Sequence, residues 1–311
     1  MRRLDQLIAQ SRRNTENTDF TEDSGIGDEE FITYANDAQE HLLEAIQNTF
    51  PRAFMEEVII ASVPGQEAYT LPDDVLLGSR IDTVEYSSNG SGDDYSVLRE
   101  GYMKERISGV RSTPSWYVRR NNQILAQPAP SSIGSFRIVY QRRLPELDIR
   151  RGQVLTVTLD TNARTITSLA LDPAVAPDAE GLLEENFITI VDKNGFQQMK
   201  RIPIDAVAPS GAVTVTPGFV YEAGETISVG DYALRGKDST TNSELPKSAE
   251  RYIRSYMNWK ILKRDSSQDS VEAVDELRAI EEKIVDSYRV PDAEVISIAI
   301  NDTQYLTFDE G

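Results

Sequence analysis

Apolar residues follow a helical spacing in only two parts of this chain. The first part has inward positions three or four residues apart, at Phe31, Ala35, Ala38, Leu42, Ala45 and Thr49. This spacing is typical of one face of an amphipathic helix. Asp28 is a suitable N-cap, and Pro51 cannot continue a helix. The pattern therefore predicts a helix over residues 28–49.

The second helical pattern lies near the end of the chain, between about Pro246 and Tyr288. Ser266 and Asp269 match a capping box, which divides the pattern into two helices, and Pro291 follows the second helix. Because amphipathic helices must bury their apolar faces, we expect this pair to pack on the opening helix as a three-helix bundle. The predicted core residues of the bundle are Phe31, Leu42, Ile46, Tyr252, Tyr256, Trp259, Leu277 and Ile284.

Almost all of the sequence between these helices is typical of β-strands. Residues 57–86 and 116–142 contain alternating apolar and polar runs, interrupted by turn signals such as Pro64-Gly65. Within the second run, 116–120 and 123–126 are expected to form a tight hairpin around Asn121-Asn122. Residues 148–230 contain short apolar runs separated by turns, of which Asp192-Lys193-Asn194-Gly195 is the strongest. No helical pattern separates these runs, so we expect a small barrel or a sandwich there.

The predicted fold class is therefore α+β. It comprises a three-helix bundle, a β-sheet and hairpin region, and an inserted all-β barrel or sandwich domain. The strand at 231–235 is expected to return to the first sheet, which makes the block before it an insertion. The predicted parts are a flexible N-terminal arm at 1–27, a core at 28–147 and 231–290, the inserted β-domain at 148–230, and a C-terminal docking tail at 291–311.

The charge of the chain argues against tight binding to nucleic acid. Its 51 acidic and 32 basic residues give a net charge of −19, and such a surface repels duplex phosphate. Residues 1–13 carry four arginines and one aspartate, whereas residues 14–50 carry ten acids and no lysine or arginine. Two interpretations stay open: a solvated acidic stretch behind a basic tip, or an arm whose basic end docks on an acidic partner.

The C-terminal segment combines acidic residues with large apolar ones. Residues 291–311 contain five acids and no lysine or arginine. Their large apolar positions are Val295, Ile296, Ile298, Ile300, Tyr305, Leu306 and Phe308. Chain termini seldom carry so many large apolar groups. We expect this segment either to dock on a partner as a strand or to pack against its own domain.

Candidate chemical groups are few. The absence of cysteine excludes disulfides and thiolate metal sites. The single histidine is His41, and the sequence contains no G-x-S-x-G motif whose serine it could activate. Gly25-Ile26-Gly27 lacks both a preceding strand and a P-loop lysine. Adjacent acids, which do not fit EF-hand spacing, occur at 29–30, 56–57, 73–74, 93–94 and 184–185. We therefore expect no enzymatic activity, no cofactor and no metal site.

Membrane and secretory signals are also missing from the sequence. No stretch approaches the ~18 apolar residues that can span a bilayer. The first thirteen residues have two early arginines but no apolar run behind them, so they do not form a secretory signal. We expect a protein without a membrane span.

Four regions of the chain carry a family resemblance. They are EEFITYANDAQEHLLEAI at 29–46, VPGQEAYTLPDDV at 63–75, TPSWYVRRNNQILAQPAP with FRIVYQRRLPEL at 113–147, and LPKSAERYIRSYMNWKILKR at 245–264. In this order they resemble the head-to-tail adaptor (connector) proteins of tailed bacteriophages, including the tail tubular protein A type. The block from 148 to 235 departs from the pattern of the shorter adaptors.

The resemblance implies a structural virion protein at the head–tail junction, assembled in the host cytoplasm. It implies a homo-oligomeric ring of about twelve copies between the portal protein and the tail (nozzle or tube) protein. Such a ring would line the channel for DNA ejection, and a negative lumen would let DNA pass without specific binding. The apolar, acidic tail would then be a tether to the portal.

Two other classes of function stay open. One is a tail-associated decoration or carbohydrate-binding module carried by the 148–230 β-domain. Its aromatic candidates are Phe187, Phe196, Phe219, Tyr221 and Tyr232, the last of these just beyond the domain. The other is a hydrolase whose two carboxylates are brought together by folding.

Overall fold

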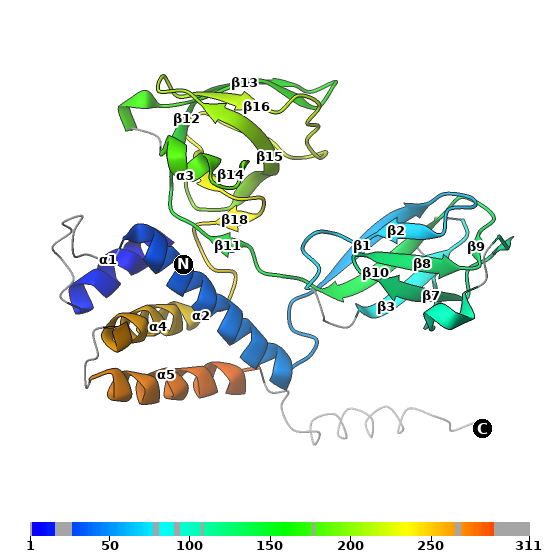
Figure 1. Cartoon of the computed structure of the whole chain (residues 1–311), viewed down its shortest axis with the longest axis horizontal. Coiled ribbons are helices and arrows are strands. Elements are labelled where there is room, and N and C mark those ends of the chain that lie inside the picture. The colour runs from blue at the N-terminus through cyan, green and yellow to red at the C-terminus, as the bar shows by residue number, and fades with distance from the viewer. Residues whose placement is uncertain are drawn as a thin grey trace, which may run out of the picture. The chain divides into compact units, whose positions relative to one another are not determined.

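Figure 1 shows the computed structural model, which describes residues 2–15, 27–76, 81–89, 94–106, 109–175, 178–264 and 269–288. These residues form a mixed α+β protein, as predicted, and the chain divides into two compact units. Unit 1 comprises residues 1–51 and 145–311, and unit 2 comprises residues 52–144. This division differs from the predicted one, which joined the first sheet to the helices and separated the 148–230 block from them.

Four helices of unit 1 form a helix cluster. Its members are α1 (Leu4–Asn14), α2 (Asp28–Thr49), α4 (Ala249–Arg264) and α5 (Asp269–Asp286). Helix α4 packs against the other three, and α2 also contacts α1 and α5. In the described part of unit 1 the cluster thus has four helices, where three were predicted. Helix α2 begins at Asp28 with Gly27 in the cap position, one residue before the predicted N-cap.

Helix α1 occupies residues 4–14 of the segment at 1–27 that was predicted to be a flexible arm. Its buried residues, at positions 4, 7, 8 and 11, recur with helical spacing. The backbone N–H of Leu4 donates a 2.8 Å hydrogen bond to the carbonyl of Thr241, which anchors the start of the helix. The sequence analysis missed this helix because its short apolar stripe lies among four arginines.

A closed barrel of six strands makes up most of the rest of the described part of unit 1. Its order is β12 (Gly152–Asp160), β13 (Thr165–Leu171), β16 (Ala212–Val215), β15 (Gln197–Val207), β14 (Phe187–Val191) and β17 (Tyr232–Arg235). Of the two predicted alternatives, the structure therefore has the barrel. The prediction that 231–235 returns to the first sheet is wrong, because β17 pairs with β12 and β14. Its backbone covers the edges of both strands and closes the barrel.

Short elements flank the barrel. The 3₁₀ turn η2 (Pro173–Val175) and helix α3 (Ala179–Leu183) follow β13. Strand β11 (Glu146–Leu147) precedes the barrel and pairs in parallel with β18 (Ser239–Thr240), which follows it. The chain therefore enters and leaves the barrel side by side.

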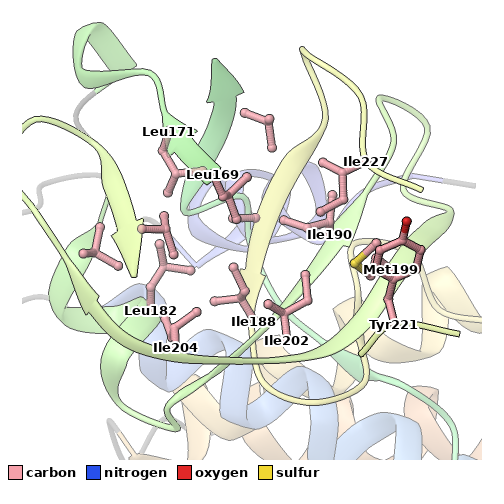
Figure 2. Packing of buried hydrophobic residues seen from close by; sticks show 14 residues of the cluster. Leu169, Leu171, Leu182, Ile188, Ile190, Met199, Ile202, Ile204, Tyr221 and Ile227 are labelled. Carbon is pink, nitrogen blue, oxygen red and sulfur yellow. The ribbon is translucent and has the colours of Figure 1, made fainter. Parts of the chain in front are cut away.

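Apolar side chains fill the interior of the barrel (Figure 2). They come from the strands, from α3 and from the segment between β16 and β17. They include Leu169, Leu171, Leu182, Ile188, Ile190, Met199, Ile202, Ile204, Tyr221 and Ile227. A barrel of this size has an interior just wide enough for its own side chains. It is therefore a packed core, and a ligand would have to bind its outer surface.

The β14–β15 hairpin turns at Asp192–Gly195, where the sequence predicts a turn. Asp192 Oδ1 accepts hydrogen bonds from the backbone N–H groups of Asn194 at 2.8 Å and Phe196 at 2.9 Å. Gly195 has φ +92°, a conformation that favours glycine. Slight burial opposes ionisation, but the hydrogen bonds outweigh it and hold the pKa of Asp192 below its ordinary value of 3.8.

We expect the stabilising effect of Asp192 to depend on pH. A carboxylate whose pKa is lowered by folding stabilises the folded state above its ordinary pKa, and this contribution is lost as the pH falls through the lowered value. The unfolding free energies of the wild type and of Asp192→Asn should therefore differ most at neutral pH and converge as the pH falls below the ordinary pKa of 3.8 and through the lowered value. Urea unfolding across this range measures the difference, and a difference that widens in acid would refute the argument.

Unit 2 consists of two four-stranded sheets and a short strand pair. One sheet has the order β1 (Met55–Ser62), β10 (Gly134–Gln141), β3 (Ile81–Ser87) and β4 (Ser96–Val97). The other has the order β2 (Ala68–Thr70), β8 (Gln123–Gln127), β7 (Trp116–Arg120) and β5 (Arg99–Glu100). The 3₁₀ turn η1 (Met103–Glu105) follows β5, and β6 (Arg111–Ser112) pairs with β9 (Ala129–Pro130).

The two sheets of unit 2 share one apolar core. Phe136 of β10 is fully buried, and its ring centroid lies 4.6 Å from that of Tyr69 in β2 and 5.0 Å from that of Tyr86 in β3. Aromatic pairs at such separations contribute beyond the area that they bury. The predicted hairpin between Trp116 and Ala126 forms β7 and β8, of which β8 continues to Gln127, and Asn121 has φ +52° in its turn.

Candidate functional site: the helix cluster and its junction with the barrel

The helix cluster buries nearly all of the residues that the sequence assigns to its core. Seven of them are at most 8% exposed: Phe31, Leu42, Ile46, Tyr252, Tyr256, Leu277 and Ile284. Trp259 is the exception, because it is only partly buried. The buried stripe of α4 instead continues through Met257 and Ile261. Trp259 lies at the margin of this stripe, and its ring packs against that of Tyr256 at 5.3 Å.

Trp259 lines an open groove between α4 and α5. The other lining residues are Lys263 of α4 and Val271, Val274, Asp275 and Arg278 of α5. The Lys263 ammonium lies 5.1 Å from the centre of the indole ring, within the range of a cation–π contact. Val271 is 68% exposed, although valine is usually buried in a helix that packs on others. The groove is thus an apolar surface with charges at its rim.

His41, the only histidine, joins three helices. Its Nδ1 lies 2.9 Å from Tyr252 Oη, which also donates a 3.2 Å hydrogen bond to Glu281 Oε2. These residues lie on α2, α4 and α5. Burial and then the negative charge of Glu281 raise the pKa of Tyr252, so its hydroxyl stays protonated and remains a donor. The arrangement is suited to holding the three helices together.

An ionic junction connects the first turn of α2 with the barrel. Arg151 lies just before β12, and its side chain is 1% exposed. It contacts three carboxylates: Asp148 at 2.9 Å, Asp178 at 2.6 Å and Glu29 at 2.7 Å. Arg235, at the end of β17, contacts the second oxygen of Glu29 at 2.8 Å and also pairs with Glu184. Glu29 therefore bridges two arginines that flank the barrel.

The electrostatics of this junction keep Arg151 charged. Burial opposes the charge, but the hydrogen bonds and the negative charge of Asp148, together with Glu29 and Asp178, raise the pKa of Arg151. Asp148 is itself 4% exposed, and its Oδ2 accepts a 2.7 Å hydrogen bond from the backbone N–H of Arg235. Arg151 thus compensates a carboxylate that water cannot reach.

The sequence analysis missed this junction. In the sequence, Glu29 and Glu184 stood out only as members of adjacent acidic pairs that do not fit EF-hand spacing. The available signal was that Asp148, Arg151 and Arg235 stand at the two ends of the strand-rich block. Because each partner is distant in sequence, no local pattern could identify them as one cluster.

Several predicted positions fall outside the described residues. They include the tail residues Val295, Ile296, Ile298, Ile300, Tyr305, Leu306 and Phe308, as well as Gly25 and Ile26. In the part of the chain that the structure describes, no three or more histidine, cysteine or acidic side chains are grouped so that they could hold a metal ion. No described helix is both long and apolar enough to cross a membrane.

Comparison with known proteins assigns the chain to a family. The family model of the SU10 adaptor protein matches residues 2–185, which is more than half of the chain. The match covers α1, α2, unit 2 and the beginning of the barrel, so it extends into the block that the sequence analysis set apart. No curated protein matches the chain. The chain therefore belongs to the SU10 adaptor protein family, and it is a structural adaptor protein of a bacteriophage.

Proposed function

We propose that copies of this chain form a closed ring at the head–tail junction, between the portal protein and the tail protein. The observation that carries the proposal is the family match over residues 2–185. A ring of about twelve copies, of the tail tubular protein A type, agrees with the sequence resemblance. Such a ring requires two different complementary faces on each copy.

We also propose that this ring lines the DNA channel. The distribution of charge along the chain supports this. Residues 52–144 contain eleven basic and eleven acidic residues, so the net charge of −19 belongs entirely to unit 1. A strongly negative surface repels the phosphate backbone. DNA could therefore slide past unit 1 without being held. Attachment to the portal through residues 291–311 stays a prediction.

No specific observation favours the carbohydrate-binding alternative. The interior of the barrel is packed with its own side chains. Lys237 lies 4.6 Å from the centre of the Phe187 ring and Arg150 lies 3.7 Å from that of Tyr232, so both rings are covered by cations. Among the described aromatic residues of the barrel, Phe196 is the one exposed ring, at 69%. Glycan platforms need more accessible aromatic surface than this.

The test is electron microscopy of the purified protein, alone and mixed with its portal protein. We expect rings with an open centre that bind to one end of the portal particle. Sedimentation velocity of the protein alone provides the control for assembly state. Portal particles that stay bare at high protein concentration, together with a protein that sediments only as a 34.8 kDa monomer, would contradict the proposal.

A further inference from the structure

Strand β1 is the one long strand at an outer position of the sheets that the structure describes. It has eight residues, and it pairs on one side with β10, while no described strand pairs with its other side. The strands at the other outer positions of unit 2 have only two or three residues. The barrel is closed and so has no outer strand. An open edge as long as β1 offers a row of backbone N–H and C=O groups to an added strand.

The side chains of β1 show that its apolar surface is incompletely covered. Ile59 is 60% exposed and lies on the face of the sheet that points away from the core of unit 2. On the other face, Val58 and Ile60 pack against this core but are only partly buried. Their partners on β10 are Ile138 and Phe136, and both are fully buried. A further strand beside β1 would therefore cover side chains that the core of unit 2 leaves open.

The chain itself contains a segment with the pattern that this edge requires. Residues 293–300 have the sequence AEVISIAI, in which Ile296, Ile298 and Ile300 would share one face of a strand. They lie in the segment 289–311, outside the described residues. The other internal segments outside the described residues are polar, as at 16–26, or shorter than five residues. Within this chain, residues 293–300 are thus the best match to an open edge of eight residues.

Charge favours an antiparallel direction for the added strand. The segment has one charged residue, Glu294. The two directions can be compared with Ser297 placed opposite Ile59. An antiparallel strand then places Glu294 opposite Ser62, whereas a parallel strand places it opposite Glu56. Like charges directly opposite each other destabilise a strand pair, so the antiparallel direction is the better one.

We propose that residues 293–300 of a neighbouring copy add to the open edge of β1 as an antiparallel strand. This inference rests on the proposed ring and names a contact that closes it. Each copy gives one strand and receives one, so a single chain carries both of the complementary faces that a head-to-tail ring requires. The added strand pairs with the open backbone of β1, and its isoleucine face covers the partly buried side chains there. Residues 301–311 stay available for the predicted attachment to the portal.

Disulfide cross-linking tests the contact directly, because the chain contains no cysteine of its own. Ile59→Cys and Ser297→Cys are introduced together, and the protein is oxidised under the conditions in which rings form. We expect a ladder of covalent oligomers on a denaturing gel that ends at the ring. Val97→Cys with Ser297→Cys is the matched control and should give no ladder. Val97 is 68% exposed and lies at the opposite edge of the same sheet, in one cross-strand row with Ile59.

The other outcomes of the cross-linking contradict the proposal. A fast-migrating monomer from the double variant would show that the segment binds within its own chain. Covalent dimers from Ile59→Cys alone would show that two copies pair through β1 itself. Either result would overturn the proposal, and so would rings seen by microscopy without a ladder, which leave the ring itself intact. A protein that never assembles, even with its portal protein, would refute the proposed ring and this contact with it.

A second pair of cysteines tests the direction of the added strand. Ala61→Cys with Val295→Cys should give the same ladder, because these positions lie opposite each other in the antiparallel arrangement. Glu57→Cys with Val295→Cys is the control, since these positions lie opposite each other only in the parallel one. A ladder from the control pair and none from the first pair would overturn the antiparallel strand.

Proline substitution provides an independent test. Alternate N–H groups of an edge strand point to its partner, so proline at one of two adjacent positions must remove a hydrogen bond of the pair. At least one of Ser297→Pro and Ile298→Pro should therefore raise the protein concentration needed for assembly roughly tenfold in sedimentation velocity. Thr303→Pro, beyond the paired residues, is the control and should assemble like the wild type. Assembly of both test variants at the wild-type concentration would overturn the proposal.

Discussion

Replacing Arg151 with methionine is expected to lower the unfolding free energy of unit 1 by about 3–5 kcal/mol. The reason is that the substitution leaves Asp148 buried at 4% exposure without its cation. It also removes the contacts from the barrel side to Asp178 and Glu29. Breaking one partner of a buried pair costs far more than the pair contributes, because the remaining charge cannot be solvated.

The measurement uses chemical denaturation followed by tryptophan fluorescence. The two tryptophans are Trp116 in unit 2 and Trp259 in unit 1, so a Trp116→Phe background reports on unit 1 alone. Arg251→Met is the matched control, because Arg251 and Glu276 form a pair in which both side chains are more than half exposed. Such pairs contribute at most about 1 kcal/mol. A loss this small for Arg151→Met would disprove the role of the junction.

A second substitution separates charge from packing. Asp148→Leu combined with Arg151→Met replaces the buried pair with apolar side chains of similar size. Since such replacements are often neutral, the double variant should be more stable than Arg151→Met alone. If the double variant is less stable than the single one, the cost arises from lost packing and not from an unpaired carboxylate.

The second large effect is expected for Phe31→Ala, at about 3–5 kcal/mol. Phe31 is fully buried in α2, and the Arg12 guanidinium of α1 lies 5.2 Å from the centre of its ring. Removing the ring leaves a cavity in the helix cluster, because the surrounding helices can relax only partly. The same denaturation experiment in the Trp116→Phe background measures the loss.

Val271→Ala is the control for this cavity. Val271 also lies in a helix of the cluster, but its 68% exposure means that little packing is lost. Surface substitutions of this kind usually change stability by about 0.5 kcal/mol or less. Equal effects of the two substitutions would show that α2 does not contribute Phe31 to a packed core.

The sequence predicted the elements whose patterns are long and local. Helix α2 follows from the spacing between Phe31 and Ile46, and the hairpin of β7 and β8 follows from Asn121-Asn122 between two apolar runs. Helix α1 was missed because its four buried positions span only eight residues. Trp259 was placed in the core because a helical pattern identifies a face but not the width of its buried part.

Local sequence patterns do not predict which distant segments of the chain pair with one another. The sequence of β17 is equally compatible with an edge of the first sheet of unit 2 and with an edge of the barrel sheet. Only its backbone hydrogen bonds to β12 and β14 show that it belongs to the barrel. The ionic junction likewise joins Glu29, Arg151 and Arg235, which are separated by more than eighty residues from one another. Charge interactions depend on distance and solvation in space, and neither can be read from spacing along the chain.

The sequence by itself determined the helix-forming segments, the strand-rich middle, the acidic charge and the resemblance to phage adaptors. Hydrophobic periodicity and turn residues carry that information, because they act within a few residues. Only the tertiary structure decided that the barrel belongs to the same compact unit as the helices and that Arg151 is buried. It alone brought together the turns that follow β1, flank β6 and precede β10, because their meeting depends on the register between strands far apart in sequence.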